Sequence, residues 1–126
     1  MKSQRGQATV EMALSLTVLF LILFGIIDFG RIFHAWIVLD HMGREAARMA
    51  SVGGTDSEVQ NVAYNASSSL DKTRITVSVT PSASNRVRGV YATVTLRYSL
   101  PISTPLMAQI IPNPFNIRNT TVMRVE

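Results

Sequence analysis

The chain begins with a long apolar segment that carries one acidic residue near its start. Glu11 precedes an uncharged run over 12–27, and charge returns at Asp28 and Arg31. As a helix this run would be about 24 Å long, whereas a bilayer core of roughly 30 Å needs about 20 residues. A helix that starts at Gln7 is long enough to span, but it places the Glu11 carboxylate at or inside the membrane boundary, where a charge is costly.

Helical periodicity continues beyond this segment. Apolar or small residues recur at spacings of three and four, with polar residues on the opposite face. The first set is Ile32, Trp36, Leu39, Gly43, Ala46 and Ala50, and the second is His34, His41, Arg44, Glu45 and Arg48. Gly53-Gly54 supplies a stop signal. The pattern predicts one helix over about 8–52, apolar all round in its first half and amphipathic in its second.

Two features refine this helix. Asp40 and Arg44 have the acid-first order that favours an ion pair between residues four apart. The small residues Gly43, Ala46 and Ala50 permit close approach of another backbone, and the chain's own sheet is favoured over a neighbouring helix as the partner.

A second helix is predicted after the glycines. Thr55 and Glu58 have capping-box spacing, and apolar residues at helical spacing follow, which indicates a helix over about 57–70. Further along, prolines indicate a segment rich in loops. Thr104-Pro105 within it predicts a single helical turn that ends near Ile110.

Three segments have the pattern of strands. Strict alternation of apolar and polar residues predicts antiparallel strands at about 74–80 and 89–99, and a weaker pattern predicts a third at 116–125. So small a sheet has little core of its own and needs the amphipathic half of the long helix as a cover. The predicted fold class is α+β, with the long N-terminal helix packed on a small antiparallel sheet of about three strands.

Composition and charge exclude some kinds of site and indicate an orientation in the membrane. The 126 residues are enough for one modest domain and an anchor, and the absence of cysteine excludes a disulfide framework and a thiolate site. The formal net charge is +4, and Lys2 and Arg5 precede the apolar run, which favours a cytoplasmic N-terminus. A cleaved secretory signal peptide is the alternative, but no Ala-x-Ala site follows the run.

Few residues in the sequence suggest catalysis or the binding of a metal or ligand. The chain has no Gly-rich phosphate loop, no Gly-x-Ser-x-Gly and no His-Glu-x-x-His, so we expect neither an enzyme nor a cofactor. His34 and His41 lie seven apart, and a zinc site would need a third ligand and a converging pocket, so a solvated surface is favoured. Arg86, Arg88 and Arg97 could form a basic patch for an acidic partner, but solvated charge is favoured and no nucleic acid is expected.

The N-terminal segment resembles a known family. The residues Arg5-Gly6-Gln7-Ala8-Thr9-Val10-Glu11 through to Ile26-Ile27-Asp28-Phe29-Gly30-Arg31 closely resemble the TadE-like family. Its members are minor pilins or pseudopilins of bacterial tight-adherence (Flp, type IVc) pilus systems. The specific resemblance covers about residues 6–50 and implies a type IV pilin-like fold.

The resemblance also implies a use for the costly carboxylate. In type IV prepilins a membrane peptidase cuts after a glycine, here Gly6, and a glutamate stands at the fifth mature position, here Glu11. The new ammonium at Gln7 would lie one helical turn from Glu11, in the same chain or a neighbour, and could set subunit register. Gln7 stands where many type IV pilins have Phe, and Met12 where many pilins have an aromatic residue. The simpler alternative for Glu11 is a carboxylate favoured by the helix dipole at the helix start.

These inferences give a domain plan. The resemblance implies a leader peptide over 1–6, a transmembrane helix over 7–30 and an extracytoplasmic domain over 31–126. Asp28 and Arg31, three residues apart where the apolar run ends, are expected to be anchors at the membrane interface, which is favoured over a contact between subunits. The chain would be a single-pass protein of the cytoplasmic membrane.

The expected function is that of a minor pilin or pseudopilin in pilus assembly, adhesion or secretion. Its partners would be a prepilin peptidase, the pilus assembly platform and other pilin subunits, which it would contact through N-terminal helices. The alternative is a permanently membrane-anchored binding or scaffold protein of the cell envelope.

Overall fold

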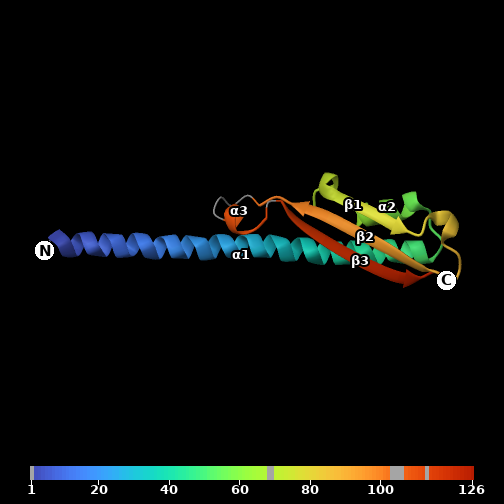
Figure 1. Cartoon of the computed structure of the whole chain (residues 1–126), viewed down its shortest axis with the longest axis horizontal. Coiled ribbons are helices and arrows are strands. Elements are labelled where there is room, and N and C mark those ends of the chain that lie inside the picture. Colours follow the sequence, from blue (N-terminus) through green and yellow to red (C-terminus); the bar gives the residue numbers. More distant parts are fainter. Residues whose placement is uncertain (1, 68–69, 103–106, 113) are drawn as a thin grey trace.

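A computed structural model shows one long helix with a small α+β domain on its C-terminal half (Figure 1). The structure describes residues 2–67, 70–102, 107–112 and 114–126. The elements are α1 (Lys2–Ser51), α2 (Asp56–Asn65), β1 (Ile75–Thr80), β2 (Tyr91–Leu100), α3 (Met107–Ile110) and β3 (Phe115–Arg124), with 3-10 turns at Lys72–Arg74 and Ala83–Asn85.

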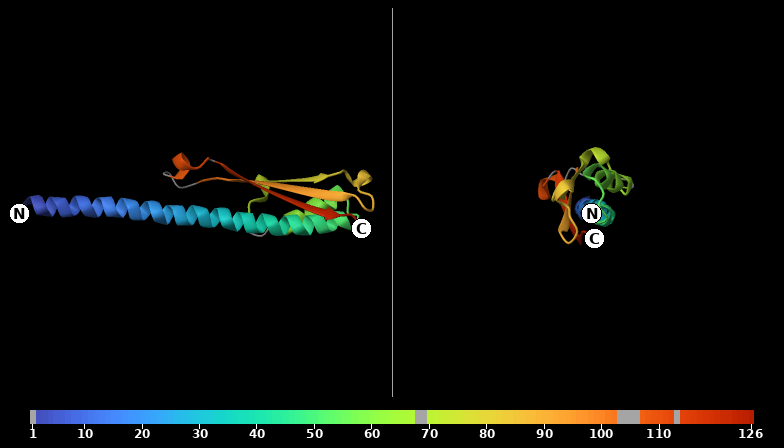
Figure 2. Two further views of the ribbon diagram at one scale, coloured as in Figure 1. Left: turned by 60° about the horizontal axis from the view of Figure 1, so that its bottom comes forward. Right: turned by 90° about the vertical axis from the view of Figure 1, so that its right-hand side faces the viewer.

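The strands form one antiparallel sheet in the order β1-β2-β3. Ile75 pairs with Tyr98 across the first ladder, and β3 pairs with β2 along its whole length, from Tyr91 opposite Arg124 to Leu100 opposite Phe115. The sheet is one layer, and the C-terminal half of α1 with α2 forms the other (Figure 2). The small sheet therefore has the helical cover that it requires.

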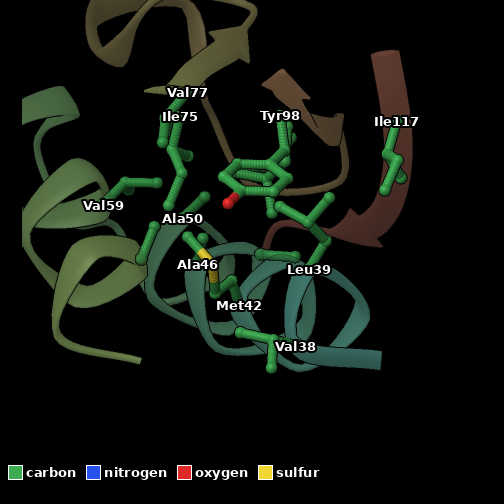
Figure 3. Close-up of a cluster of buried hydrophobic side chains, with 14 of the residues drawn as sticks. Val38, Leu39, Met42, Ala46, Ala50, Val59, Ile75, Val77, Tyr98 and Ile117 are labelled. Carbon is green, nitrogen blue, oxygen red and sulfur yellow. The ribbon is translucent and has the colours of Figure 1, made fainter. Parts of the chain in front are cut away.

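The core lies between these two layers. Leu39, Met42 and Leu96 are its largest fully buried apolar side chains, and the ring of Tyr98 lies among residues of β1 and α1 (Figure 3). From α1 the buried residues are Ala35, Val38, Leu39, Met42, Ala46, Ala47 and Ala50. The sheet contributes Ile75, Val77, Ala92, Val94, Leu96, Tyr98, Leu100 and Ile117. Small residues on α1 let its backbone approach the sheet closely.

The architecture confirms the predicted fold class. A long N-terminal apolar helix, a second short helix and a three-stranded antiparallel sheet make up an α+β, pilin-like arrangement. The capping box is present: the Glu58 backbone N–H donates to the Thr55 hydroxyl, and the Thr55 N–H donates to the Glu58 carboxylate at 2.8 Å. The α1 helix ends before Gly53, whose φ of +88° suits glycine.

Three boundaries or placements differ from the predictions. The α1 helix already begins at Lys2, because nothing between Lys2 and Gln7 interrupts helical hydrogen bonding. The α2 helix ends at Asn65, five residues early, where the Ser67 hydroxyl donates to the Tyr64 carbonyl at 2.6 Å and competes with the helical pattern. Trp36 is 52% exposed, since the buried face is centred on Ala35 and Leu39.

The helical turn predicted near residue 110 is present as α3, Met107–Ile110. Thr104, Pro105 and Leu106, which were expected to open it, lie outside the described residues.

Candidate functional site

The most unusual surface of the molecule is the first half of α1, residues 3–27, which we call the uncovered segment. Figure 1 shows it projecting from the domain. Leu21 and Phe24 are half-buried, and the other large apolar side chains are 41–64% exposed: Val10, Met12, Leu14, Leu16, Val18, Leu19, Phe20, Ile22, Leu23, Ile26 and Ile27. A continuous apolar surface of this kind needs an apolar environment.

The uncovered segment has the length and composition of a membrane helix. Among the described residues, α1 is the one helix that is long and apolar enough to cross a membrane, with a mean hydropathy of 2.5 in its most apolar window. It lies at the N-terminus, where signal sequences also lie. The helix therefore indicates a membrane anchor or a signal.

Glu11 lies on this surface with a neutral partner. The Gln7 side-chain amide donates to a Glu11 carboxylate oxygen at 3.3 Å, one turn earlier in the helix. Within the described part of the chain, no basic group lies within 4 Å of this carboxylate. Glu11 therefore has unused capacity to accept hydrogen bonds from a cation.

The predicted scission point lies within regular helix. Gly6 is exposed, and a side chain added there would meet nothing within 4 Å. Within the described residues, the Gly6 and Gln7 positions are therefore exposed on the surface of α1 and are not covered by another element.

Asp28 marks the point where the domain begins to cover α1. The residue is only 1% exposed, and Arg31 approaches it at 3.8 Å while donating to the Pro101 carbonyl at 3.2 Å. Among the described residues, neither Asp28 oxygen accepts a hydrogen bond. The chain that follows β2 passes this point, and α3 lies beside the middle of α1 (Figure 1).

The burial of Asp28 was missed from the sequence, although a signal was present. Asp28 precedes Ala35 by seven residues and Leu39 by eleven, so it continues the buried face of α1 towards the N-terminus. The expected role of Asp28 and Arg31 at the membrane interface stays a prediction. The structure adds that the carboxylate is covered by its own chain.

An apolar stripe continues on the other side of α1, beyond the start of the domain. Phe29, Phe33, Trp36 and Ile37 are 51–64% exposed at helical spacing, and we call them the aromatic stripe. The stripe ends where Asp40 and Arg44 form an exposed ion pair. From Met12 to Ile37 this side carries no charged residue over about 38 Å at 1.5 Å per residue.

That length exceeds the hydrocarbon core of a bilayer by roughly 10 Å. A helix tilted enough to immerse all of it would lean at the limit of the usual range of about 0–40°. Part of the stripe therefore fits better against protein than against lipid.

The two histidines do not gather with other potential metal ligands in the part of the chain that the structure describes. His34 and His41 are exposed, and the described residues contain no group of three or more His, Asp or Glu side chains close enough to hold a metal ion. An open cleft of about 410 Å³ lies beside Arg31 and His34, with Tyr98 and Leu100 on its far wall.

Arg86 is neither solvated charge, as the sequence favoured, nor part of a surface patch, so both sequence-based interpretations are wrong for this residue. Its side chain is 1% exposed, and the guanidinium donates to the Asp56 carboxylate at 2.5 Å and to the Gly54 carbonyl at 2.7 Å. It also donates to the Pro81 carbonyl at 2.9 Å. Arg86 therefore joins the α1–α2 turn, the start of α2 and the loop after β1.

Comparison with known proteins identifies the same segment that the geometry singles out. A family model described as TadE-like protein matches residues 6–48. No curated protein and no solved structure gave a match. The matched residues run from the predicted scission glycine through the uncovered segment, Asp28 and the aromatic stripe. Through residues 6–48 the chain carries the sequence of the TadE-like protein family, and the resemblance inferred from the sequence is confirmed.

Proposed function

We propose that this chain is a minor pilin or pseudopilin of a tight-adherence pilus or secretion system. The family match points to a pilin-like protein associated with such pili. The more specific proposal is based on the uncovered segment. Glu11 lies near its start, and the apolar surface that begins in it is longer than the hydrocarbon core of a bilayer is thick. No enzymatic step is assigned to it.

In this proposal the protein occupies two environments in turn, first the membrane and then the pilus. In the first, the chain spans the cytoplasmic membrane with its N-terminus inside, and residues 31–126 lie outside. A prepilin peptidase removes residues 1–6, which leaves Gln7 as the first residue. In the second, the uncovered segment leaves the lipid and packs against the helices of other pilin subunits on the assembly platform. Helix packing then covers the surface that lipid covered before.

Two observations support this exchange of partners. The aromatic stripe extends the apolar surface past the length that lipid covers, so a neighbouring helix would bury residues such as Trp36 that neither lipid nor the chain's own domain buries. Among the described residues Glu11 accepts a hydrogen bond from the Gln7 amide and has no basic group within 4 Å, so its carboxylate is available to an ammonium group of another subunit. An intramembrane charge of this kind is tolerated when it is paired.

Processing is tested by the intact mass of the protein from cells with an active prepilin peptidase. We expect a chain that begins at Gln7, with or without cyclisation of that residue. Gly6→Leu should leave residues 1–6 attached, because the peptidase cuts after glycine. A chain that still begins at Met1 in the unaltered protein would refute the processing step.

The assembly role is tested by Glu11→Gln. The variant should insert into the membrane normally but enter sheared pilus fractions poorly, because the register-setting charge is lost. Glu45→Gln is the matched control, since it makes the same chemical change at a half-buried position in the packed half of α1. Equal incorporation of both variants would contradict the role of Glu11. If the unaltered protein stays in the membrane and never appears in pilus fractions, the anchored binding or scaffold protein is the better description.

A further inference from the structure

The outer face of the sheet, which points away from α1 and α2, has an unbalanced charge. Its residues alternate with the buried ones along each strand, and all the charged ones are basic. They are Thr76, Ser78 and Thr80 from β1, Tyr91, Thr93, Thr95, Arg97 and Ser99 from β2, and Asn116, Arg118, Thr120, Val122 and Arg124 from β3. We call this surface the basic face.

Two arginines stand directly opposite each other on the basic face. Arg97 pairs with Arg118 in the β2–β3 ladder, and both side chains are exposed. Like charges in this position destabilise a sheet. Elsewhere Arg31, Arg44, Arg74 and Arg86 each have an aspartate within 4 Å. In the described part of the chain, no carboxylate lies that close to Arg97, Arg118 or Arg124.

A second cationic point lies six residues further along β3, at a distance of about 20 Å. There a guanidinium nitrogen of Arg124 lies 3.8 Å from where a side chain at Gly89 would begin. Arg88, Gly89 and Arg124 line a cleft of about 420 Å³ together with Val125 and Glu126. Gly89 has a φ of +93°, which favours glycine and keeps this approach clear of a side chain.

Between the two points the surface is rich in hydroxyl groups. Thr93, Thr95 and Thr120 follow the strands, and Tyr91, which is 63% exposed, stands opposite Arg124 in the ladder. Threonine hydroxyls donate and accept hydrogen bonds, arginines bind carboxylates in a bidentate manner, and an exposed aromatic ring offers a flat apolar surface.

We propose that the basic face binds a linear acidic polysaccharide. Its carboxylates would sit at the Arg97–Arg118 pair and beside Arg124 and Arg88, with the sugar hydroxyls on the threonines between. A single exposed aromatic residue is a poor stacking platform for the bases of a nucleic acid. Two cationic points about 20 Å apart along the strands suit an extended chain better than a compact acidic protein. This inference goes beyond the proposed function and does not depend on entry into a pilus.

The test uses the full chain in nanodiscs of zwitterionic lipid, so that no anionic lipid competes. The probes are alginate oligomers, which are linear polymers of carboxylate-bearing sugars, with uncharged dextran as the control. Single-stranded DNA and poly-glutamate represent the other classes of polyanion. We expect alginate to bind and dextran not to bind. The alginate affinity should fall between about 50 and 300 mM salt, because exposed charges are screened.

Variants locate the site. Arg97→Gln with Arg118→Gln should weaken alginate binding by about tenfold or more, since two charge-assisted contacts are lost. The matched control is Arg48→Gln, an exposed arginine of α1 that should change the affinity less than twofold. Arg124→Gln should weaken binding of oligomers long enough to span both points, but not of short ones. Thermal unfolding checks that the double variant remains folded, as expected when opposed like charges are removed.

Three results would overturn the proposal. The first is that the unaltered chain does not bind alginate. The second is that Arg48→Gln loses as much alginate affinity as the Arg97→Gln, Arg118→Gln double variant. The third is that DNA or poly-glutamate binds more tightly than alginate of equal charge.

Discussion

The two halves of α1 are continuous in backbone but opposite in how their side chains are covered. Over residues 3–27 most of the large apolar side chains are 41–64% exposed, whereas Leu39, Met42 and Ala46 are fully buried. The packed half carries small residues where the sheet approaches, whereas the second part of the uncovered segment, residues 19–27, consists of leucine, isoleucine and phenylalanine apart from Gly25. The domain is therefore stabilised by one half of the helix, and the other half presents its apolar surface to something outside the chain.

The same leucine-to-alanine substitution should have very different effects in the two halves of α1. Leu39→Ala removes a fully buried side chain, and we expect the domain to lose about 3 kcal/mol of unfolding free energy, within the usual range of roughly 2–5. Leu19→Ala, at a position 48% exposed on the same helix, should leave the stability of the domain within about 0.5 kcal/mol of the original.

Urea unfolding in mild detergent measures both variants. Hydrogen exchange of the β2 amides reports the domain itself rather than the helix. If Leu19→Ala destabilised the domain as much as Leu39→Ala, the division of α1 into an uncovered and a packed half would be wrong.

The next largest effect concerns a polar contact rather than a core residue. Arg86→Ala removes the guanidinium that bonds the Gly54 and Pro81 carbonyls and Asp56, so we expect a loss of about 2–3 kcal/mol. Arg86→Lys should recover only part of it, because an ammonium group does not reproduce the planar fork. Arg88→Ala, two residues later and exposed, is the control and should change the same unfolding measurement little. Equal effects at both positions would contradict the clamp.

Periodicity was enough to predict much of this fold. The spacing of apolar residues predicted α1, and strict alternation predicted β1 and β2, because both follow from one local repeat. Thr55 and Glu58 predicted the start of α2 through a local capping motif. The weaker pattern after residue 115 also predicted β3, which lies within one residue of the expected range.

What the sequence did not predict depends on contacts between distant segments. Asp28 continues the buried face of α1 that Ala35 and Leu39 define, but the residues near it do not reveal which distant segment covers that face. Pro101, whose carbonyl accepts a hydrogen bond from Arg31, lies 70 residues after Arg31 in the chain. Arg86 looked like a surface charge because its partners Asp56 and Gly54 are about 30 residues away. Trp36 was placed in the core because a stripe read at spacings of three and four has an uncertain edge, and Trp36 lies on that edge.

Alanine substitutions at two glycines of α1 should change stability in opposite directions. A side chain at Gly43 would begin 2.5 Å from the Thr121 hydroxyl and 2.7 Å from the Asn119 side chain, whereas one at Gly25 would meet nothing within 4 Å. We expect Gly43→Ala to destabilise the domain by about 1–2 kcal/mol through overpacking. Gly25→Ala should instead strengthen the helix by up to about 1 kcal/mol without changing domain unfolding.

Circular dichroism of helix melting and urea unfolding of the domain separate these two effects. The prediction fails if both variants shift domain unfolding in the same direction.

The smallest expected effect lies where the aromatic stripe of α1 gives way to polar residues. Arg44 donates hydrogen bonds to Asp40 and, as the main cause, lowers the pKa of this carboxyl below its ordinary value of 3.8, although burial opposes the shift. Because the pKa is lower in the folded state, the pair stabilises the fold above the unfolded value and loses this contribution as the pH falls through the folded value. Asp40→Asn should therefore be slightly less stable than the original at about pH 6, and the difference should vanish well below 3.8. Unfolding measurements across this pH range give the difference in stability, and an NMR titration of the Asp40 carboxyl gives its pKa. A difference in stability that persisted at low pH would mean that it comes from the contact with Asn119 rather than from charge.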